Sequence, residues 1–184
     1  MRLRAATPVD AAAVAAIYAH YVETSIVTFE LDPPGEEEMR ERMAAVAGLY
    51  PWIVAEAEDG RIAGYAYACA FRPRAAYRFA VETTVYLAPD AAGRGLGTAL
   101  YRPLIRTLEA QGYTQAVAAI ALPNDPSVGL HEKLGFVHAG TYAKVGYKLG
   151  RWVDVGLWQR PLAAAETPPV EPLPLAAVGG PYLE

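Results

Sequence analysis

The stretch Gly93-Arg94-Gly95-Leu96-Gly97 decides the fold of this chain, because it joins a predicted strand at residues 79–87 to a predicted helix. The helix is indicated by leucines that recur at every fourth position from residue 96 to residue 108. Glycines let the backbone take positive φ, and the first N–H groups of a helix have no partner inside it. With the charge of Arg94, the loop predicts a phosphate site. A tight connection without a ligand is the alternative, and the spacing fits neither a Walker motif nor a dinucleotide fingerprint.

Strands and helices alternate irregularly around this loop. Expected strands cover residues 2–6, 52–56, 62–71, 79–87 and 114–122, and residues 136–147 and 152–159 predict a closing hairpin. Expected helices begin after Thr7, cover residues 36–46 and 96–112, and run from a cap at Asp125 or Ser127 to residue 134. This order predicts an α/β (α+β) domain with a mixed sheet. It argues against a doubly wound sheet, which needs regular strand–helix alternation.

The composition excludes several classes of function. The chain has 184 residues, of which 53% are hydrophobic and 20% charged, which fits one globular domain. A single cysteine, Cys69, and three well-separated histidines exclude a disulfide framework and argue against a metal site. Residues 1–160 hold 17 acids and 16 bases, a net charge of −1, which argues against nucleic acid as a partner.

The end of the chain differs from its body. Residues 161–184 contain 6 of the 15 prolines and 3 acids but no Lys or Arg, so we expect a Pro-rich tail that is extended and lies outside the fold. The N-terminus lacks the apolar run of a signal peptide, and no segment is apolar enough for a transmembrane helix. We therefore expect no membrane partner and a cytoplasmic location.

The glycine loop, a helix, a strand, a turn at Asn124 and a helix ending in Lys-Leu-Gly-Phe at residues 133–136 resemble, in this order, the GNAT superfamily of acyl-CoA-dependent N-acetyltransferases. The resemblance implies a GNAT fold, with a mixed, mostly antiparallel sheet that is splayed at its central strands and flanked by helices. It also implies acetyl-CoA as cosubstrate, with its pyrophosphate on the glycine loop. The residues implied in cofactor binding are Val85, Tyr86, Leu87, Gly93, Arg94, Gly95, Leu96, Gly97, Thr98, Asn124 and Ser127.

Ala92 departs from the family pattern, which usually has Arg or Gln at that position. The pyrophosphate is therefore expected to rest mainly on backbone N–H groups and Arg94. The departure bears on affinity for the cofactor rather than on its identity.

Several longer stretches resemble phosphinothricin N-acetyltransferases more narrowly. They include Leu-Pro-Asn-Asp-Pro-Ser at residues 122–127 and Asp-Val-Gly-Leu-Trp-Gln at residues 154–159. The resemblance covers residues 1–160, which we expect to form the acetyltransferase domain. It implies a small amino-acid-like substrate, such as phosphinothricin, methionine sulfoximine or methionine sulfone, and a homodimer.

Glu82 is the first candidate catalytic residue. It lies among apolar residues of a strand, where a carboxylate is unfavourable unless it is partnered or used. The resemblance implies that it is the general base, since the substrate amine arrives as an ammonium and must lose a proton before it attacks the thioester. A solvent-facing or salt-bridged residue is the alternative.

His131 is the second candidate catalytic residue. It lies seven residues after Asn124, where many GNAT members have a tyrosine that protonates the departing thiolate and the phosphinothricin group has a histidine. The resemblance implies that His131 supplies this proton or acts as a second base beside Glu82. An exposed helix histidine is the alternative.

A polar and cationic run precedes the strand that carries the candidate base. Guanidinium groups bind carboxylate and phosphinate oxygens in paired geometry, and the resemblance places Arg72, Arg74 and Tyr77 at substrate-contacting positions. A solvated loop is the alternative. Phe29 is implied as an apolar pocket wall, or else as a core aromatic. Thr84 shares a strand face with the candidate base and either hydrogen-bonds the substrate or fills the sheet.

These residues predict direct attack of the amine on acetyl-CoA, because Cys69 is interpreted as a small buried residue rather than a nucleophile. Two other functions remain open. One is a non-catalytic acyl-CoA-binding or sensing module, and the other is a GNAT enzyme that acts on protein or peptide amines. The candidate pair Glu82 and His131 argues against the first, and the arginine cluster favours small anionic molecules over the second.

Overall fold

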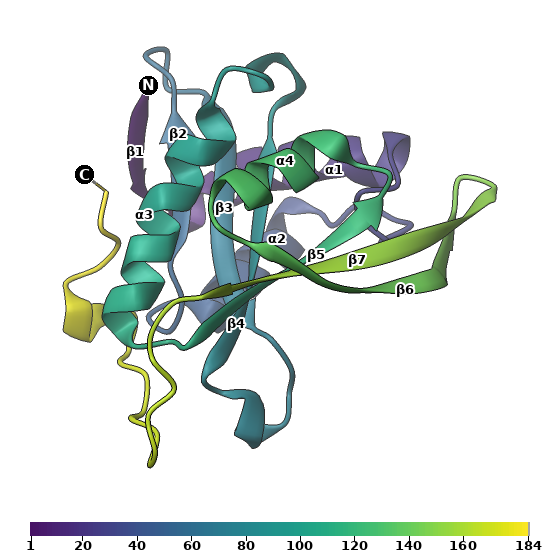
Figure 1. Ribbon diagram of the computed structural model, residues 1–184. Helices are drawn as coiled ribbons and strands as arrows, with labels where there is room; N and C mark the ends of the chain where they lie inside the picture. The colour runs from purple at the N-terminus through teal and green to yellow at the C-terminus, as the bar shows by residue number, and fades with distance from the viewer. Residues whose placement is uncertain (184) are drawn as a thin grey trace.

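The computed structural model describes residues 1–183 and contains one mixed sheet with the strand order β1-β2-β3-β4-β5-β7-β6 (Figure 1). The strands are β1 (Arg2–Ala5), β2 (Trp52–Glu56), β3 (Ile62–Ala70), β4 (Ala80–Leu87), β5 (Gln115–Leu122), β6 (Val137–Lys148) and β7 (Arg151–Pro161). The helices are α1 (Ala11–Thr24), α2 (Glu36–Val46), α3 (Leu96–Gln111) and α4 (Asp125–Lys133). Short 3₁₀ turns are η1 (Pro8–Asp10), η2 (Ala75–Tyr77), η3 (Pro89–Ala91) and η4 (Leu175–Val178). Each predicted strand and helix is present, with ends shifted by a few residues at most.

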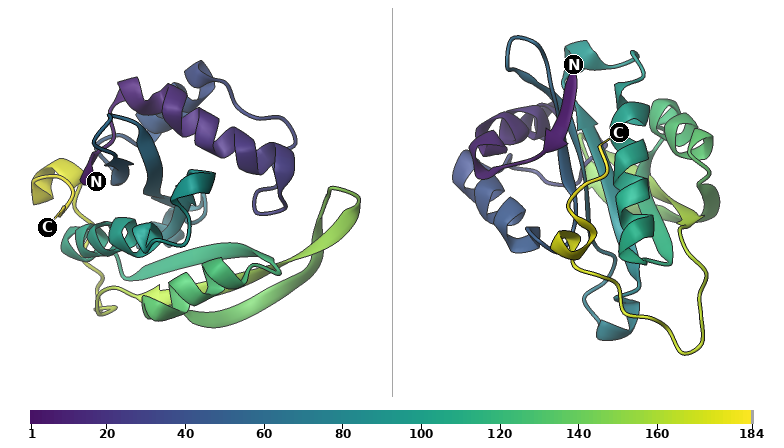
Figure 2. Two further views of the ribbon diagram at one scale, coloured as in Figure 1. Left: turned by 90° about the horizontal axis from the view of Figure 1, so that it is seen from above. Right: turned by 90° about the vertical axis from the view of Figure 1, so that its left-hand side faces the viewer.

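The helices cover both faces of the sheet. Figure 2 shows α1 and α2 on one face and α3 and α4 on the other. The core lies between these layers, and its fully buried side chains include Val14 of α1, Ile53 of β2 and Leu100 of α3. None of the helices in residues 1–183 is long and apolar enough to cross a membrane. The arrangement confirms the predicted α+β domain with a mixed sheet.

The centre of the sheet is splayed. Neighbouring strands pair antiparallel except β4 and β5, which run parallel. Their pairing covers only Ala80–Glu82 of β4 and Gln115–Val117 of β5, and beyond it the two strands diverge (Figure 1). This confirms the splayed centre that the resemblance implied, and it places a gap in the middle of the molecule.

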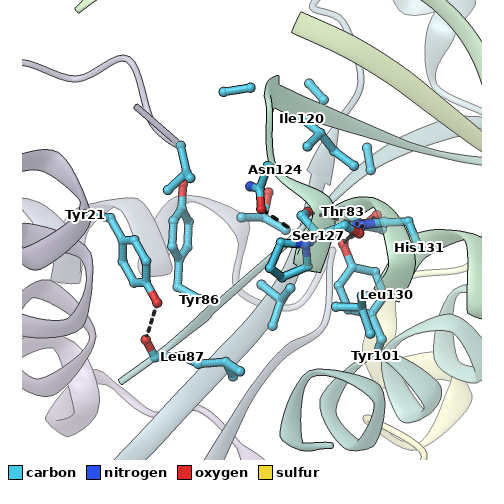
Figure 3. A pocket seen from close by; sticks show the side chains of 17 residues that line it. Tyr21, Thr83, Tyr86, Leu87, Tyr101, Ile120, Asn124, Ser127, Leu130 and His131 are labelled. Atoms are coloured by element: carbon cyan, nitrogen blue, oxygen red, sulfur yellow. Dashed lines mark hydrogen bonds between the residues drawn. The ribbon is translucent and has the colours of Figure 1, made fainter. Parts of the chain in front are cut away.

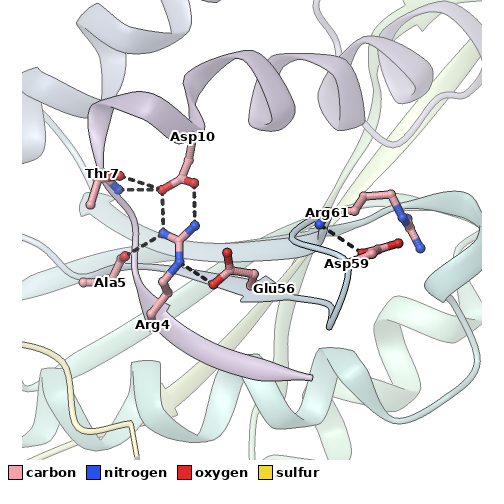
Figure 4. Close-up of polar contacts among 7 residues, drawn as sticks. All are labelled: Arg4, Ala5, Thr7, Asp10, Glu56, Asp59 and Arg61. Carbon is pink, nitrogen blue, oxygen red and sulfur yellow. Dashed lines mark hydrogen bonds and ion pairs between the residues drawn. The ribbon is translucent and has the colours of Figure 1, made fainter.

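An arginine ties the first strand to the first helix (Figure 4). The guanidinium of Arg4 donates to both oxygens of Asp10, at 2.7 and 2.8 Å, and to Glu56 at 2.9 Å. Asp10 also accepts from the backbone N–H of Thr7 at 2.8 Å, which is one half of a capping box. Burial raises the pKa of the Asp10 carboxyl, but the hydrogen bonds from Arg4 and Thr7 outweigh it and hold that pKa below its usual value.

Gly64 allows β3 to lie close to the end of β4. A Cβ built on Gly64 would lie 2.6 Å from Cδ2 of Leu87 and 3.0 Å from the backbone oxygen of Tyr86. We expect Gly64→Ala to lower the free energy of unfolding by about 1–3 kcal/mol, because a backbone neighbour cannot move aside. Gly129→Ala is the matched control, since Gly129 lies in α4 with open space around it. This variant should not be destabilised, because alanine has a higher helix propensity than glycine. Chemical denaturation measures both, and equal midpoints would contradict the prediction.

The C-terminal segment packs on the fold, so the expectation that it lies outside is wrong. The backbone N–H of Leu173 donates to the oxygen of Gln111 at 2.7 Å, and that of Leu175 donates to Gly48 at 2.9 Å. Near the end of the described chain, the backbone N–H of Tyr182 donates to the hydroxyl of Thr107 at 2.9 Å. Groups in the last turns of α3 and in the turn before β2 therefore accept hydrogen bonds from backbone N–H groups of the C-terminal segment, which forms few regular hydrogen bonds within itself. Glu184, the last residue of the predicted tail, lies outside the described residues.

Candidate active site

A cavity of about 340 Å³ opens where β4 and β5 diverge (Figure 3). Its walls come from the second half of β4, from β5 and from α4, together with Tyr21 of α1 and Tyr101 of α3. The hydroxyl of Tyr21 donates to the backbone oxygen of Leu87 at 2.7 Å, so α1 holds the end of β4 in place. The cavity brings together seven residues that the sequence singled out, which are Thr84, Val85, Tyr86, Leu87, Asn124, Ser127 and His131.

The glycine loop follows β4 and begins α3. Gly93 and Gly95 have φ of 75° and 80°, a left-handed backbone that other residues adopt only with strain, and Gly95 is the N-cap of α3. Arg94 is exposed, Thr98 is half-buried, and the first turn of α3, which the structure describes in full, carries no acidic side chain. Free N–H groups, the helix dipole and a cation therefore favour an anion at this point.

Close packing seats the beginning of α3 on α4. A Cβ built on Gly97 would lie 3.0 Å from Cδ2 of Leu130, a residue that lines the cavity. Leu96 beside it is buried in the core. The glycine loop and the cavity wall thus belong to one packed unit.

The N-cap of α4 is Asn124, not Asp125 or Ser127 as the sequence predicted. Oδ1 of Asn124 accepts from the backbone N–H of Ser127 at 3.3 Å. Asn is among the preferred residues at this position, and Pro126 in the first turn needs no hydrogen-bond partner for its nitrogen. The cap fixes two cavity residues, Asn124 and Ser127, relative to each other.

Glu82 is half-buried at the point where β4 leaves β5. It is the last β4 residue that pairs with β5, opposite Val117, and on its other side it faces Cys69 of β3. Burial raises the pKa of the Glu82 carboxyl above its usual value, and the charge of Arg72 offsets part of this effect. A carboxylate with a raised pKa is a better proton acceptor near neutral pH.

The thiol of Cys69 stays protonated beside this carboxyl. Burial, followed by the negative charge of Glu82, raises the pKa of the Cys69 thiol to about 11. Because the thiolate is the nucleophilic form of cysteine, a thiol with this pKa is a poor nucleophile at neutral pH.

The loop at residues 71–79 places one cation close to the candidate base. Arg72 is exposed, and its guanidinium carbon lies 5.2 Å from the centre of the Phe71 ring. Tyr77 packs edge-on against the same ring, with the ring centres 5.7 Å apart. Arg74 is exposed in the same loop. Arg72 is thus the residue of this loop whose charge reaches Glu82.

Two residues of the predicted site region contact other parts of the chain. Arg78 donates to Glu171 of the C-terminal segment at 2.8 Å, so the tail rather than the cavity holds this guanidinium. Phe29 is 41% exposed and lies directly against Gly146 of β6, outside the walls of the central cavity. The structure therefore does not bring Phe29 together with the residues of β4 and α4.

His131 is buried, with an exposed fraction of 3%, so the alternative of an exposed helix histidine is wrong. Nδ1 lies 2.7 Å from the backbone oxygen of Ser127, one turn earlier in α4. Nε2 lies 2.8 Å from the hydroxyl of Tyr101 on α3. Burial lowers the pKa of the His131 ring below its usual value, and the contact with Ser127 offsets part of this effect.

Comparison with known proteins identifies the family. The acetyltransferase (GNAT) domain family matches residues 3–157. The chain belongs to the GNAT acetyltransferase family. The phosphinothricin N-acetyltransferase of Streptomyces viridochromogenes is 46% identical to this acetyltransferase over 174 residues, which cover 94% of each chain. The L-methionine sulfoximine/L-methionine sulfone acetyltransferase of Pseudomonas aeruginosa is 41% identical over 120 residues, 65% of this chain and 70% of the relative.

A solved structure shares the fold of this acetyltransferase. The crystal structure of a GNAT superfamily phosphinothricin acetyltransferase from Sinorhizobium meliloti in complex with AcCoA matches with a TM-score of 0.85 and 42% sequence identity, and the match covers 88% of each chain. The family and the fold that the sequence predicted are therefore confirmed.

Three hydroxyl-bearing residues of the cavity wall of this acetyltransferase could not be recognised from the sequence. Tyr21 follows the apolar face of α1, Tyr101 lies between leucines of α3, and Thr83 shares a strand face with Val81 and Val85. Each position fits the core pattern of its element, so the periodicity gives no sign of a polar role. The contacts of the Tyr101 hydroxyl with Thr83 and with His131, 30 residues away on another helix, distinguish it from a core tyrosine.

Proposed function

We propose that this acetyltransferase moves the acetyl group of acetyl-CoA to the amino group of a small amino acid with a tetrahedral polar tail, such as phosphinothricin, methionine sulfoximine or methionine sulfone. The observation that carries the proposal is the half-buried carboxyl of Glu82, whose pKa is raised and which ends the pairing of β4 with β5, one residue before Thr83 of the cavity wall. The substrates named for the relatives from Streptomyces viridochromogenes and Pseudomonas aeruginosa support this class.

The residues present suit acetyl-CoA, which supplies the activated acyl group as a thioester. The N–H groups after Gly93 and Gly95, together with Arg94, suit the pyrophosphate, as do the dipole and free donors of α3. Ala92 offers no polar side chain there, so the backbone carries most of this contact. The edge of β4 that β5 leaves uncovered suits the pantetheine arm, and the remaining residues proposed for the cofactor are Val85, Tyr86, Leu87, Leu96, Gly97, Thr98, Asn124 and Ser127.

Glu82 takes a proton from the substrate ammonium, either directly or through a water molecule. The freed amine attacks the thioester carbonyl, so a C–N bond forms and the C–S bond breaks. The sulfur leaves as a thiolate and gains a proton. His131 takes part in the proton transfer that neutralises the thiolate. Transfer is direct, because the thiol of Cys69 is protonated at neutral pH and offers no competing nucleophile.

Cations beside the base suit an anionic substrate. Arg72 and Arg74 are exposed on the loop before β4 and bind carboxylate or phosphinate oxygens in paired geometry. Tyr77 supports them from the same loop, and Thr84 adds a hydroxyl on the strand face of Glu82. Phe29 forms an apolar wall only if its segment moves away from Gly146, where the structure places it.

Residues 1–160 form the catalytic domain in this proposal, and residues 161–184 are a C-terminal extension that packs on it. The protein assembles as a homodimer through the hairpin of β6 and β7. Large apolar side chains are exposed along this hairpin, among them Tyr147 at 58% and Trp152 at 61%. Exposed large apolar side chains that gather on one element are typical of a protein interface.

The proposal is tested by thiol release from acetyl-CoA with phosphinothricin, methionine sulfoximine and methionine sulfone. Glutamate and methionine are the matched controls, because they share the amino-acid head but lack the tetrahedral tail. We expect turnover with the first three and a much higher KM for the controls. Acetyl-CoA binding without turnover on any amine would instead indicate a sensing module, and better turnover with a peptide library would indicate a protein substrate. Either outcome would overturn the proposal.

A further inference from the structure

Tyr101 is fully buried, with an exposed fraction of 0%, yet it belongs to the wall of the cavity (Figure 3). Its hydroxyl lies 2.8 Å from Nε2 of His131 and 3.3 Å from Oγ1 of Thr83. Thr83 in turn lies 3.3 Å from the backbone oxygen of Val117. A hydroxyl among apolar residues needs such partners, so polar contacts as well as packing fix this ring.

The contacts of the His131 ring assign its protons. The oxygen of Ser127 can only accept, so Nδ1 carries the hydrogen that it receives. Because burial lowers the pKa of the ring, the imidazole is neutral near neutral pH and has a single N–H. Nε2 is therefore unprotonated, and the hydroxyl of Tyr101, which has one hydrogen, donates it to Nε2 at 2.8 Å rather than to Thr83 at 3.3 Å.

Aromatic packing holds the imidazole in this orientation. The Tyr101 and Phe136 rings both lie edge-on to it, with ring centres 5.0 and 5.1 Å away and interplanar angles of 78° and 86°. The two aromatic rings are themselves nearly perpendicular. Exchange of Nδ1 and Nε2 by a ring flip would require all three rings to move in a close-packed core.

We propose that Tyr101 and His131 act as one unit, in which the Tyr101 hydroxyl passes a proton between the reacting atoms and Nε2 of His131. This inference rests on the proposed acetyl transfer and assigns Tyr101 a catalytic role in it. In the tautomer that the structure assigns, Nε2 has no proton to give to a thiolate, so His131 is first a proton acceptor and only then a donor.

The protons balance over the reaction. Glu82 removes the first proton from the ammonium. When the C–N bond forms, the nitrogen gives its second proton to the oxygen of Tyr101, whose own proton moves to Nε2 of His131. The imidazolium then returns a proton by the same route to the thiolate that the broken C–S bond releases. Tyr101 stays neutral between steps, which suits a buried phenol whose pKa is raised.

The tautomer is tested on the unmodified protein by ¹⁵N NMR with labelled histidine. The chain has only three histidines, and the spectrum of His131→Ala assigns the resonances of His131. At neutral pH we expect Nε2 to show the chemical shift of an unprotonated nitrogen and Nδ1 that of an N–H. The opposite assignment would overturn the inference, because Nε2 could then donate directly.

Kinetics of Tyr101→Phe, His131→Ala and the double variant test the coupling. We expect Tyr101→Phe to lower kcat about 100-fold, with the KM for acetyl-CoA changed less than about 3-fold. The double variant should be no slower than His131→Ala, because both changes break one route. Multiplied losses in the double variant would mean independent roles and would contradict the inference.

Tyr113→Phe is the matched control for these kinetics. Tyr113 is also a buried tyrosine, but it stacks on Tyr50 away from the cavity. We expect this variant to keep the kcat of the unmodified protein, and a loss equal to that of Tyr101→Phe would show that any buried hydroxyl supports activity through stability alone. If the unmodified protein itself shows no turnover, the proposed function fails. If it turns over and Tyr101→Phe does so equally well, only the present inference fails.

Discussion

Glu82→Gln is expected to lower kcat on the order of 100- to 10,000-fold with phosphinothricin or methionine sulfoximine, because a neutral amide cannot take the ammonium proton. The KM for acetyl-CoA should change little, since the substitution is nearly isosteric and leaves the β4 backbone, the glycine loop and α4 in place. Steady-state kinetics by thiol release measure both quantities. Activity within about 3-fold of the unmodified protein would exclude Glu82 as the base.

The same residue predicts the acidic limb of the pH profile. Burial raises the pKa of Glu82, so the carboxylate needed for catalysis is lost at a higher pH than for an ordinary glutamate. We expect kcat/KM to fall as the pH drops through this raised pKa. The limb should be absent from the residual activity of Glu82→Gln.

Stability distinguishes a catalytic role of Glu82 from a structural one. A carboxyl whose folded pKa is raised stabilises the fold only while protonated, and this contribution is lost as the pH rises through that pKa. At neutral pH Glu82→Gln should therefore keep or raise the Tm. Glu56→Gln is the matched control on β2, because Glu56 is half-buried but accepts from Arg4 at 2.9 Å. It should lower the Tm and leave kcat unchanged.

Removal of residues 165–184 is expected to lower the free energy of unfolding by about 2–4 kcal/mol, since hydrogen bonds to buried groups contribute about 1 kcal/mol each. The truncation deletes one hydrogen-bond partner of the Gln111 side chain and one of the Thr107 hydroxyl, both of which belong to fully buried residues. Two backbone hydrogen bonds from Leu173 and Leu175 are lost as well. Denaturation in urea measures the change, and an unchanged midpoint would contradict the prediction.

Glu171→Ala separates the two effects of this truncation. Its ion pair with Arg78 is exposed and contributes little to stability, so the urea midpoint should hardly move. The pair does tether the loop that carries Arg74 and Tyr77, however. We therefore expect both the truncation and Glu171→Ala to raise the KM for the amino-acid substrate. An unchanged KM in both would show that the loop holds its position without the tail.

The sequence predicts most of the architecture because the core elements follow simple periods. Leucines at every fourth residue indicate α3. The helix start is also predictable, because the leucine pattern begins directly at the glycine loop. The packing of the C-terminal segment could not be predicted in this way, and the reason is physical. Its prolines and acids are typical of a solvated segment, but prolines also reduce the entropy lost when an extended segment is ordered. The backbone carbonyl and the side-chain amide of Gln111 then form hydrogen bonds with Leu173, which no local sequence pattern shows.

Site residues that lie together on one element can be predicted from the sequence, but contacts between residues of two elements cannot. Glu82 and Thr84 share a face because strand residues alternate, and both positions follow from the sequence. The role of Asn124 as a cap depends on the local turn, in which three residues compete. The pairing of Tyr101 with His131 depends on how α3 crosses α4 over the sheet, which no spacing within either helix encodes.

The strand order has a consequence for synthesis of the protein on the ribosome. β7 lies between β5 and β6, so β6 is made before the only strand that joins it to the rest of the described sheet. Until residues 151–161 emerge, the outer edge of β5 carries unpaired backbone groups, an open template for aggregation. A chain stopped before residue 151 would expose that edge permanently.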